Sequence, residues 1–236
     1  FSGCGSLTSL NINDVATIGS MDDAAFAWSG LRSTGLDKVV GLSSIPENAY
    51  NGCSALTDTG LGGNTSITSI GVNAFKNCSR LATTGLENNT TIKTLREGCF
   101  SGTNMSGGLT LPLYSKIEEL PSRAFYGSKL ETVYFGCDHV VLINSTTFPK
   151  QNMTVMVPAK MVSQYASGRP KEVWESCNGS LPVPVGKMLQ KIKVSRDPDK
   201  MAYQQGDTIS LEGMSVTFQY PHSTMDSDYE ALIKDE

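Results

Sequence analysis

AFKNCSRL, residues 74–81, is nearly the same as AYNGCSAL, residues 49–56. In both segments an aromatic residue follows alanine, and a cysteine stands three positions after the aromatic residue. A single copy would be compatible with a reactive thiol in a turn. Because the copies lie about 25 residues apart, they instead indicate a repeat, in which Cys53 and Cys78 serve packing rather than chemistry.

The aromatic residue of this motif recurs along most of the chain. Successive copies keep a nearly constant spacing of about 25 residues, at Phe1, Phe26, Tyr50, Phe75, Phe100, Phe125 and Phe148. Other columns keep the same period, including an apolar pair such as Ile67 and Ile70 ahead of each aromatic residue. A unit of this length cannot bury its own apolar face and must stack on its neighbours. The sequence therefore predicts a solenoid with a buried spine of aromatic rings.

Each repeat is expected to contain one short strand, a turn, a second apolar ridge and an aromatic-led turn with helical or 3₁₀ character. Apolar alternation is clearest in GGLTLPL (107–113) and KLETVYF (129–135). Stacking of these strands predicts a right-handed solenoid with a parallel sheet and one strand in every repeat. The Gly and Asn residues of GGNTS (62–66) and ENNTT (87–91) are expected in tight turns with positive φ.

The repeat resembles the BspA-like leucine-rich repeat, also called the Treponema pallidum type. The unit of that family has the form I-x-x-x-A-F-x-x-C-x-x-L, which SIGVNAFKNCSRL (69–81) matches closely. The resemblance covers about residues 1–160 and implies a leucine-rich-repeat solenoid. The chain departs from the family at Trp28, where Gly usually stands, and at Thr59 and Thr84, which replace the central aliphatic residue of the strand.

The end of the array has a family resemblance of its own. MTVMVPAKMVSQYASGRPKEVW (153–174) resembles the closing segment of many such arrays, with a last strand and a short helix. A terminal cap must cover the apolar face of the last turn, and Val162, Tyr165 and Trp174 are suited to do so. We therefore assign residues 1–177 to the array, with the cap at about 155–177.

A different pattern follows the array. NGSLPVPVG (178–186) has the turn-forming residues and prolines of a linker. Residues 187–236 resemble part of a bacterial Ig-like domain, and the matching positions are Tyr203, Gly206, Asp207, Leu211, Gly213, Val216 and Tyr220. Alternation around Ile192 and Val194, and at Met214, Val216 and Phe218, predicts half-buried strands. The expected fold is a partial β-sandwich; a β-rich tail packed on the cap is the alternative.

Composition and motifs argue against several classes of function. The net charge is −4 at a pI near 5.3, so no basic stripe is available for nucleic acid. No apolar run approaches the roughly 18 residues of a membrane span. No CxxC pair occurs and only two histidines are present, so we expect neither a metal site nor a cofactor. No GxSxG motif occurs, and adjacent Asp138 and His139 would face opposite ways on a strand; we expect no catalytic residues and no enzymatic activity.

The six cysteines are expected to be free thiols. The column of Cys53 and Cys78 also contains Ser29, Thr103 and Ser128, so it requires a small side chain rather than a nucleophile. Adjacent turns lie about 4.8 Å apart, within the Cα range for a disulfide. Stacked side chains point in parallel, however, which disfavours a bridge.

The family resemblance implies a bacterial cell-surface protein, with its signal and anchor outside this chain. We expect a non-enzymatic interaction module that binds a protein or glycan on host or neighbouring cells. A passive stalk, or an ancillary glycan-binding region of a larger surface enzyme, remains an alternative. The candidate binding surface lies on the concave strand face, at Glu131, Tyr134 and Met156, with Arg32 and Asp58 as further candidates. Because Phe1 opens in mid-repeat, weak self-association through the cut N-terminal repeat is also expected.

Overall fold

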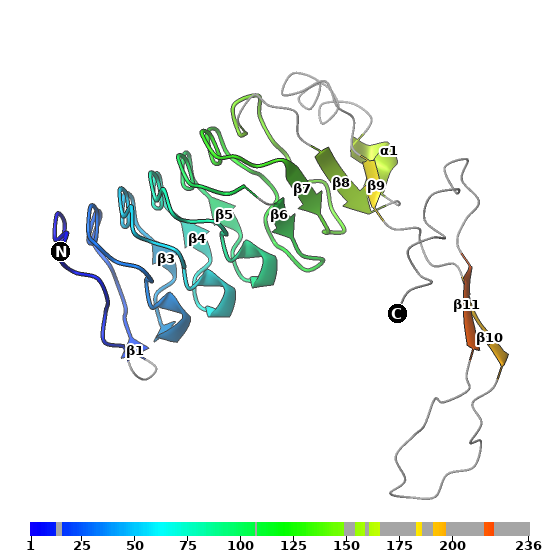
Figure 1. Ribbon diagram of the computed structural model, residues 1–236, viewed down its shortest axis with the longest axis horizontal. Helices are drawn as coiled ribbons and strands as arrows, with labels where there is room; N and C mark the ends of the chain where they lie inside the picture. The colour runs from blue at the N-terminus through cyan, green and yellow to red at the C-terminus, as the bar shows by residue number, and fades with distance from the viewer. Residues whose placement is uncertain are drawn as a thin grey trace, which may run out of the picture. The chain divides into compact units, whose positions relative to one another are not determined.

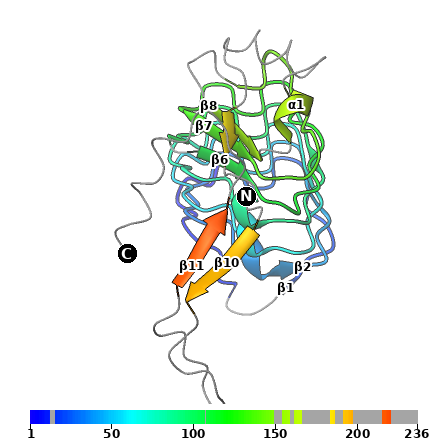
Figure 2. The ribbon, with the colours of Figure 1, turned by 90° about the vertical axis from the view of Figure 1, so that its right-hand side faces the viewer.

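The computed structural model describes residues 1–12, 16–106, 108–148, 154–158 and 161–165, and the backbone of 183–185, 191–196 and 215–219. The chain divides into two compact units, Phe1–Val185 and Gly186–Glu236. The first unit is a solenoid whose turns stack side by side (Figure 1). In Figure 2 these turns overlap, because each one repeats the path of the turn before it.

Backbone hydrogen bonds in the aromatic-led turns hold the stack in register. Three alternate amides of one turn donate to the next turn: that of Tyr50 to the Ala74 carbonyl at 2.8 Å, and those of Asn48 and Gly52 to the carbonyls of Val72 and Lys76. The same three bonds recur one repeat later, from Asn73, Phe75 and Asn77. We call this set the turn ladder. It explains the nearly constant period, because a residue inserted within an aromatic-led turn would displace the ladder bonds of that turn.

The aromatic spine is confirmed between Tyr50 and Phe148. Consecutive rings from Phe1 to Phe148 stack with centroids 5.3–5.8 Å apart and nearly parallel planes. Tyr50, Phe75, Phe100 and Phe125 are fully buried. The expectation of burial was wrong for Phe1, which is 73% exposed, and only partly right for half-buried Phe26. Among the described residues, Phe1 stacks only on Phe26, on one face of its ring.

In the earlier repeats, two-residue parallel strands lie at the second apolar ridge or just before it. They are β1 (Ala16–Thr17) with β2 (Val39–Val40), and β3 (Ser44–Ile45) with β4 (Ser69–Ile70) and β5 (Thr94–Leu95). Ile45, Ile70 and Leu95 pair in register and are buried. Equivalent residues of successive turns are therefore neighbours in space.

The predicted strands at 107–113 and 129–135 are confirmed in the later repeats. They are β6 (Gly108–Leu111) and β7 (Thr132–Phe135), which continue into β8 (Thr154–Pro158) and β9 (Val183–Val185). All four strands are parallel, in the order β6-β7-β8-β9. β9 lies inside the segment expected to be a linker.

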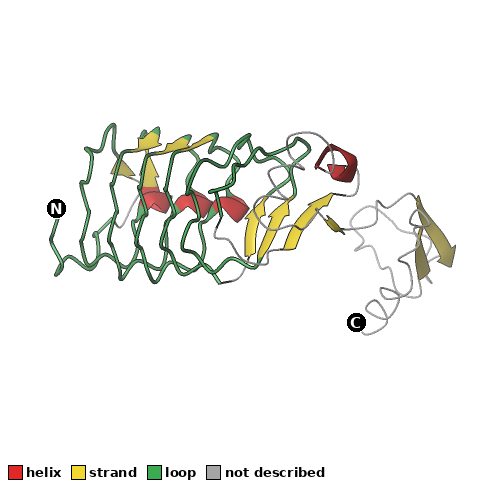
Figure 3. Cartoon of the chain, turned by 90° about the horizontal axis from the view of Figure 1, so that it is seen from above, coloured by secondary structure: helices red, strands yellow, loops and turns green. Residues whose placement is uncertain are grey.

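We expected a strand in every repeat at the position that β6 and β7 occupy. This expectation was wrong for three earlier turns. They carry 3₁₀ helices instead: η1 (Leu36–Lys38), η2 (Leu61–Gly63) and η3 (Leu86–Asn88). Figure 3 shows these helices in a row that β6–β8 continue. We expected a helical or 3₁₀ twist in the aromatic-led turns. In the described residues they are hydrogen-bonded turns instead.

Two residue types cause the change from strand to 3₁₀ helix. Gly35, Gly60 and Gly85 precede the helices in left-handed conformation, with φ of 69°, 65° and 80°. In β6–β8 the same column holds Thr110, Tyr134 and Met156, whose side chains disfavour the left-handed conformation. The residue before each glycine is a buried threonine whose hydroxyl accepts the amide of the helix's first leucine, as Thr59 does for Leu61 at 3.2 Å.

Asn64 and Asn89 have a different role from the one expected of them. Asn64 follows η2 with a negative φ of −86°, and the glycines that precede the 3₁₀ helices supply the positive φ instead. Its buried amide donates to the carbonyls of Leu36 and Val39 in the preceding turn, and its oxygen accepts two amides of its own turn. Asn89 repeats this pattern one turn later. These bonds satisfy polar groups inside the core, where an unpaired group would be costly.

The described part of the cap agrees with its predicted role. α1 (Val162–Tyr165) places Tyr165 against Phe135, with ring centroids 5.8 Å apart. The buried Tyr165 hydroxyl accepts the Val141 amide at 2.8 Å. Val162 packs on the core. Trp174 lies outside the described residues.

The second unit contains an antiparallel pair, β10 (Lys191–Arg196) and β11 (Ser215–Gln219). Ile192 pairs with Phe218 and Val194 with Val216, so the predicted strands are present. Met214 and the Ig-like positions Tyr203, Gly206, Asp207, Leu211, Gly213 and Tyr220 lie outside the described residues.

Replacing Phe75 by Ala removes a fully buried ring from the middle of the spine. We expect the free energy of unfolding to fall by roughly 3–5 kcal/mol, measured by denaturant titration. Phe1→Ala is the matched control, because Phe1 is 73% exposed and stacks on one ring only; its effect should be about 1 kcal/mol or less. Equal effects of the two changes would contradict a buried spine.

Replacing Tyr50 by Phe should increase stability. The Tyr50 hydroxyl is buried and has no hydrogen-bond partner among the described residues. Removing a buried unsatisfied hydroxyl should raise the free energy of unfolding by about 1 kcal/mol, since Phe fills this column in the other turns. A destabilised variant in thermal unfolding would show that the hydroxyl is satisfied.

Candidate functional site

Tyr134 and Met156 lie side by side on the outward face of the sheet. Their Cα positions pair in the β7–β8 register, and Thr110 of β6 pairs with Tyr134 on the other side. All three are half-buried, whereas the intervening Val133 and Val155 are buried in the core. Alternation along the strands therefore turns Tyr134 and Met156 away from the core, as the sequence predicted.

A glycine allows the Tyr134 ring to lie close to the sheet. A Cβ atom at Gly136 would come within 3.2 Å of the ring carbon Cε1 of Tyr134, so the ring extends over this residue. Gly136 is itself fixed by its amide, which donates to the Leu111 carbonyl at 2.8 Å. The Tyr134 ring can therefore lie against the backbone of Gly136 on the outward face of the sheet.

Glu131 is exposed but lies beside this pair rather than within it. It precedes β7 by one residue, and its carbonyl accepts the Thr154 amide at 2.8 Å. At about 3.3 Å per extended residue, Glu131 stands roughly 10 Å along the chain from Tyr134. Glu131 therefore stands at the edge of the Tyr134 surface, which we define as Glu131, Tyr134 and Met156.

Arg32 and Asp58 are exposed but belong to earlier turns. Arg32 follows the leucine of its motif as Glu131 does, four turns away, or roughly 19 Å at the usual strand spacing. The Asp58 carboxylate accepts hydrogen bonds from the Ser33 hydroxyl at 3.2 Å and the Gly60 amide at 2.9 Å. Asp58 thereby helps to shape the turn before η2. The structure does not bring these two residues to the Tyr134 surface.

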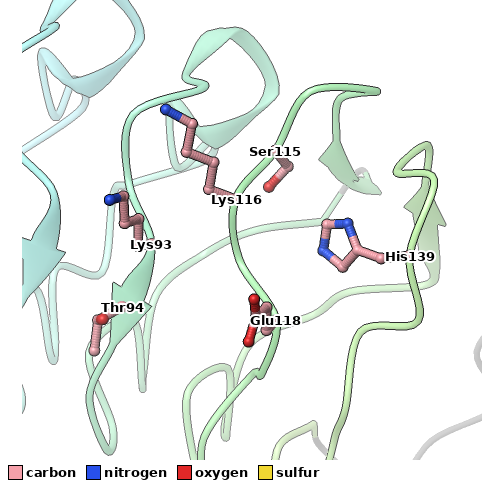
Figure 4. Close-up of a pocket in the computed structure, with 6 residues that line it drawn as sticks. All are labelled: Lys93, Thr94, Ser115, Lys116, Glu118 and His139. Atoms are coloured by element: carbon pink, nitrogen blue, oxygen red, sulfur yellow. The ribbon is translucent and has the colours of Figure 1, made fainter.

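A polar groove was not predicted from the sequence. Its volume is about 540 Å³, and it is lined by Lys93, Thr94, Ser115, Lys116, Glu118 and His139. In Figure 4 Glu118 lies between His139 on one side and Lys93 and Thr94 on the other. The groove therefore offers hydrogen-bond donors and acceptors, and charges of both signs, to a polar ligand.

Backbone contacts orient His139 in this groove. Its Nε2 donates to the Ile117 carbonyl at 2.9 Å, which places Nδ1 3.4 Å from the Asp138 carboxylate. Ser115 is buried, and its hydroxyl accepts the Ile117 amide. The absence of a catalytic group remains a prediction.

The groove residues come from three turns and are not part of the repeated motif. The repeat period alone therefore did not predict the groove. One signal was available. The Lys93 amide donates to the Thr68 carbonyl, and the Thr68 amide donates to that of Ser43, so these residues form a column. The column changes from small polar residues to a charged one at Lys93, and Glu118 follows one repeat later.

The cysteine column serves packing. Cys53 and Cys78 are fully buried free thiols, and each Sγ donates to a backbone carbonyl of the preceding turn, that of Phe26 or Tyr50. Burial raises the pKa of both thiols, that of Cys99 to about 12 and that of Cys137 to about 11. Buried thiols of raised pKa are poor nucleophiles. Cys4 is a free and exposed thiol, and Cys177 lies outside the described residues.

Within the described residues, no three His, Cys, Asp or Glu side chains gather closely enough to hold a metal ion. No helix in the described part of the chain has the length and apolar character needed to cross a membrane.

Thiol reactivity tests the packing role. In a Cys4→Ser/Cys177→Ser variant at about pH 8, we expect no rapid reaction of the folded protein with a thiol reagent, because the four remaining thiols are buried and protonated. Unfolding without reductant should expose all four, and unfolded wild-type protein should show six. Fast labelling of the folded variant, or a thiol missing after unfolding, would contradict burial or the free state.

No curated protein matches the chain. Residues 20–155 match the family described as the BspA type leucine rich repeat region, in 6 copies. These copies cover more than half of the 236 residues and coincide with the stacked turns. The chain belongs to the BspA-type leucine-rich repeat family.

Proposed function

We propose that the repeat array is a non-enzymatic interaction module of a bacterial cell surface, which binds a protein ligand through the Tyr134 surface. The observation that carries this proposal is the in-register pair of Tyr134 and Met156 on the outward face. The core is complete without them, since Val133, Phe135 and Val155 fill the inward positions. These two large side chains are thus available for binding.

The chemistry of the surface suits a protein partner. Aromatic residues and Met are enriched at protein interfaces, where large side chains fill pockets on the partner. Small polar residues, Thr110, Thr132 and Thr154, surround the pair along the same face. Glu131 adds an exposed carboxylate at the edge, where a charge affects orientation more than affinity.

The cell-surface location and the second unit belong to the same proposal. In this proposal, residues 187–236 would act as an Ig-like spacer. The antiparallel pairing of β10 and β11 supports a sandwich domain, which is built from such strands. A passive stalk would bind nothing through the array. An ancillary region of a surface enzyme would bind glycans instead.

A binding screen tests the Tyr134 surface. The intact chain is measured against a panel of purified extracellular-matrix proteins and glycans, together with a Glu131→Ala/Tyr134→Ala variant of unchanged melting temperature. For a protein ligand we expect the variant to bind at least about tenfold more weakly, as for loss of an interface tyrosine.

A Lys93→Ala/Glu118→Ala variant serves as the matched control, since it also removes one long side chain and one carboxylate, but from the polar groove. It should bind as the wild type does. If only this control variant lost binding, the interface would be assigned to the polar groove and not to the Tyr134 surface. No protein ligand at all would support the stalk, and glycan binding alone would support the ancillary region.

A further inference from the structure

Trp28 is an exposed aromatic residue in a strained backbone conformation. Its φ is 59° and its side chain is 60% exposed. In the other turns the same column of left-handed residues holds Gly3, Gly52, Asn77, Gly102 and Gly127. Glycine adopts this conformation freely and asparagine with little cost, whereas a bulky side chain is disfavoured by about 1–2 kcal/mol.

The turn ladder shows why the conformation is retained despite the strain. The Trp28 amide donates to the Asn51 carbonyl at 2.8 Å, as the Gly52 amide does to Lys76 and the Asn77 amide to Ser101. The ladder therefore fixes the backbone at this column whichever residue occupies it. It accounts for the left-handed φ but does not require an indole. Strain of this kind is concentrated at functional sites.

The indole lies flat on the next turn. A Cβ atom at Gly52 would stand 2.5, 2.5 and 2.8 Å from the ring atoms Cδ2, Cε3 and Cζ3 of Trp28. A point nearly equidistant from three successive ring atoms lies over the ring face and not beside its edge. One face of the indole thus covers the Gly52 backbone. With the side chain 60% exposed, its opposite face is open to solvent.

We propose that Trp28 is a stacking platform for a neutral carbohydrate ring. The apolar C–H face of a pyranose packs on an open aromatic face, while its hydroxyl groups need polar neighbours. Exposed Ser54 lies two residues after Gly52, and exposed Asn77 stands at the same column in the turn beyond. The surroundings are therefore small and polar around one flat apolar surface.

A protein partner fits this place less well. Among the described residues 1–12 and 16–60, the other exposed large apolar side chains are Phe1, whose ring stacks on Phe26 in the spine, and Val40 of β2. The centre of a protein interface usually gathers several such groups. The platform lies several turns from the Tyr134 surface, so it is a further site, independent of the proposed function.

The test uses the full chain and four neutral probes: cellotriose, laminaritriose, chitotriose and lactose. Binding is measured by calorimetry and by saturation transfer from protein to sugar protons. We expect at least one probe to bind in the millimolar range, and Trp28→Gly to weaken that binding by about tenfold or more, as expected for loss of ring stacking. Glycine is native to this column, so the melting temperature should be unchanged or higher.

Two further variants keep the test decisive. Trp28→Asn introduces the residue that the column holds at position 77, and it should lose binding in the same way. Tyr126→Ala removes another exposed aromatic side chain, 57% exposed and outside this column, and should retain binding. Failure of all four sugars to bind at about 10 mM would overturn the proposal. Equal binding by both Trp28 variants, or Trp28-dependent binding of a matrix protein alone, would do so as well.

Discussion

The turn ladder is the constraint on which the rest of this solenoid depends. Alternate amides of each aromatic-led turn donate to the next turn, as those of Phe75 and Asn77 do to Cys99 and Ser101. For the outer amides to point along the stack, their residues adopt positive φ, which explains two columns rich in Gly and Asn. The ring between them is then held over its counterpart in the next turn, so spine and ladder enforce one register. Trp28 and Arg123 show that this register is kept even where the residue is poorly suited to it.

Outside the ladder the repeats have more freedom, and local chemistry decides their form. A buried threonine followed by glycine gives a 3₁₀ helix, because the hydroxyl accepts an amide and the glycine turns the chain. An aliphatic residue followed by Thr110, Tyr134 or Met156 gives an extended strand. Only an extended segment presents a side chain outward at this column. The later turns can therefore carry a binding surface where the earlier ones carry glycine.

Exposure separates the residues available for function from those that only stabilise the stack. The Cys53 and Cys78 thiols, the Asn64 amide and the Thr59 hydroxyl have partners inside the solenoid. The Tyr134 surface, the groove around Glu118 and the Trp28 platform have side chains on the outside. They lie on different columns and different turns. A stacked array can accommodate such surfaces independently, since a change at one outward position leaves the ladder intact.

The sequence by itself determined the period, the solenoid, the aromatic spine, the packing role of Cys53 and Cys78, and the outward position of Tyr134 and Met156. These features depend on spacing, and spacing is preserved when equivalent residues stack. It did not determine the 3₁₀ helices, because Thr59 and Gly60 look like a weakened strand until their hydrogen bonds are known. Nor did it reveal the groove, whose residues come from three turns, or the flat position of Trp28. Those features depend on contacts between different columns, which only the tertiary structure decides.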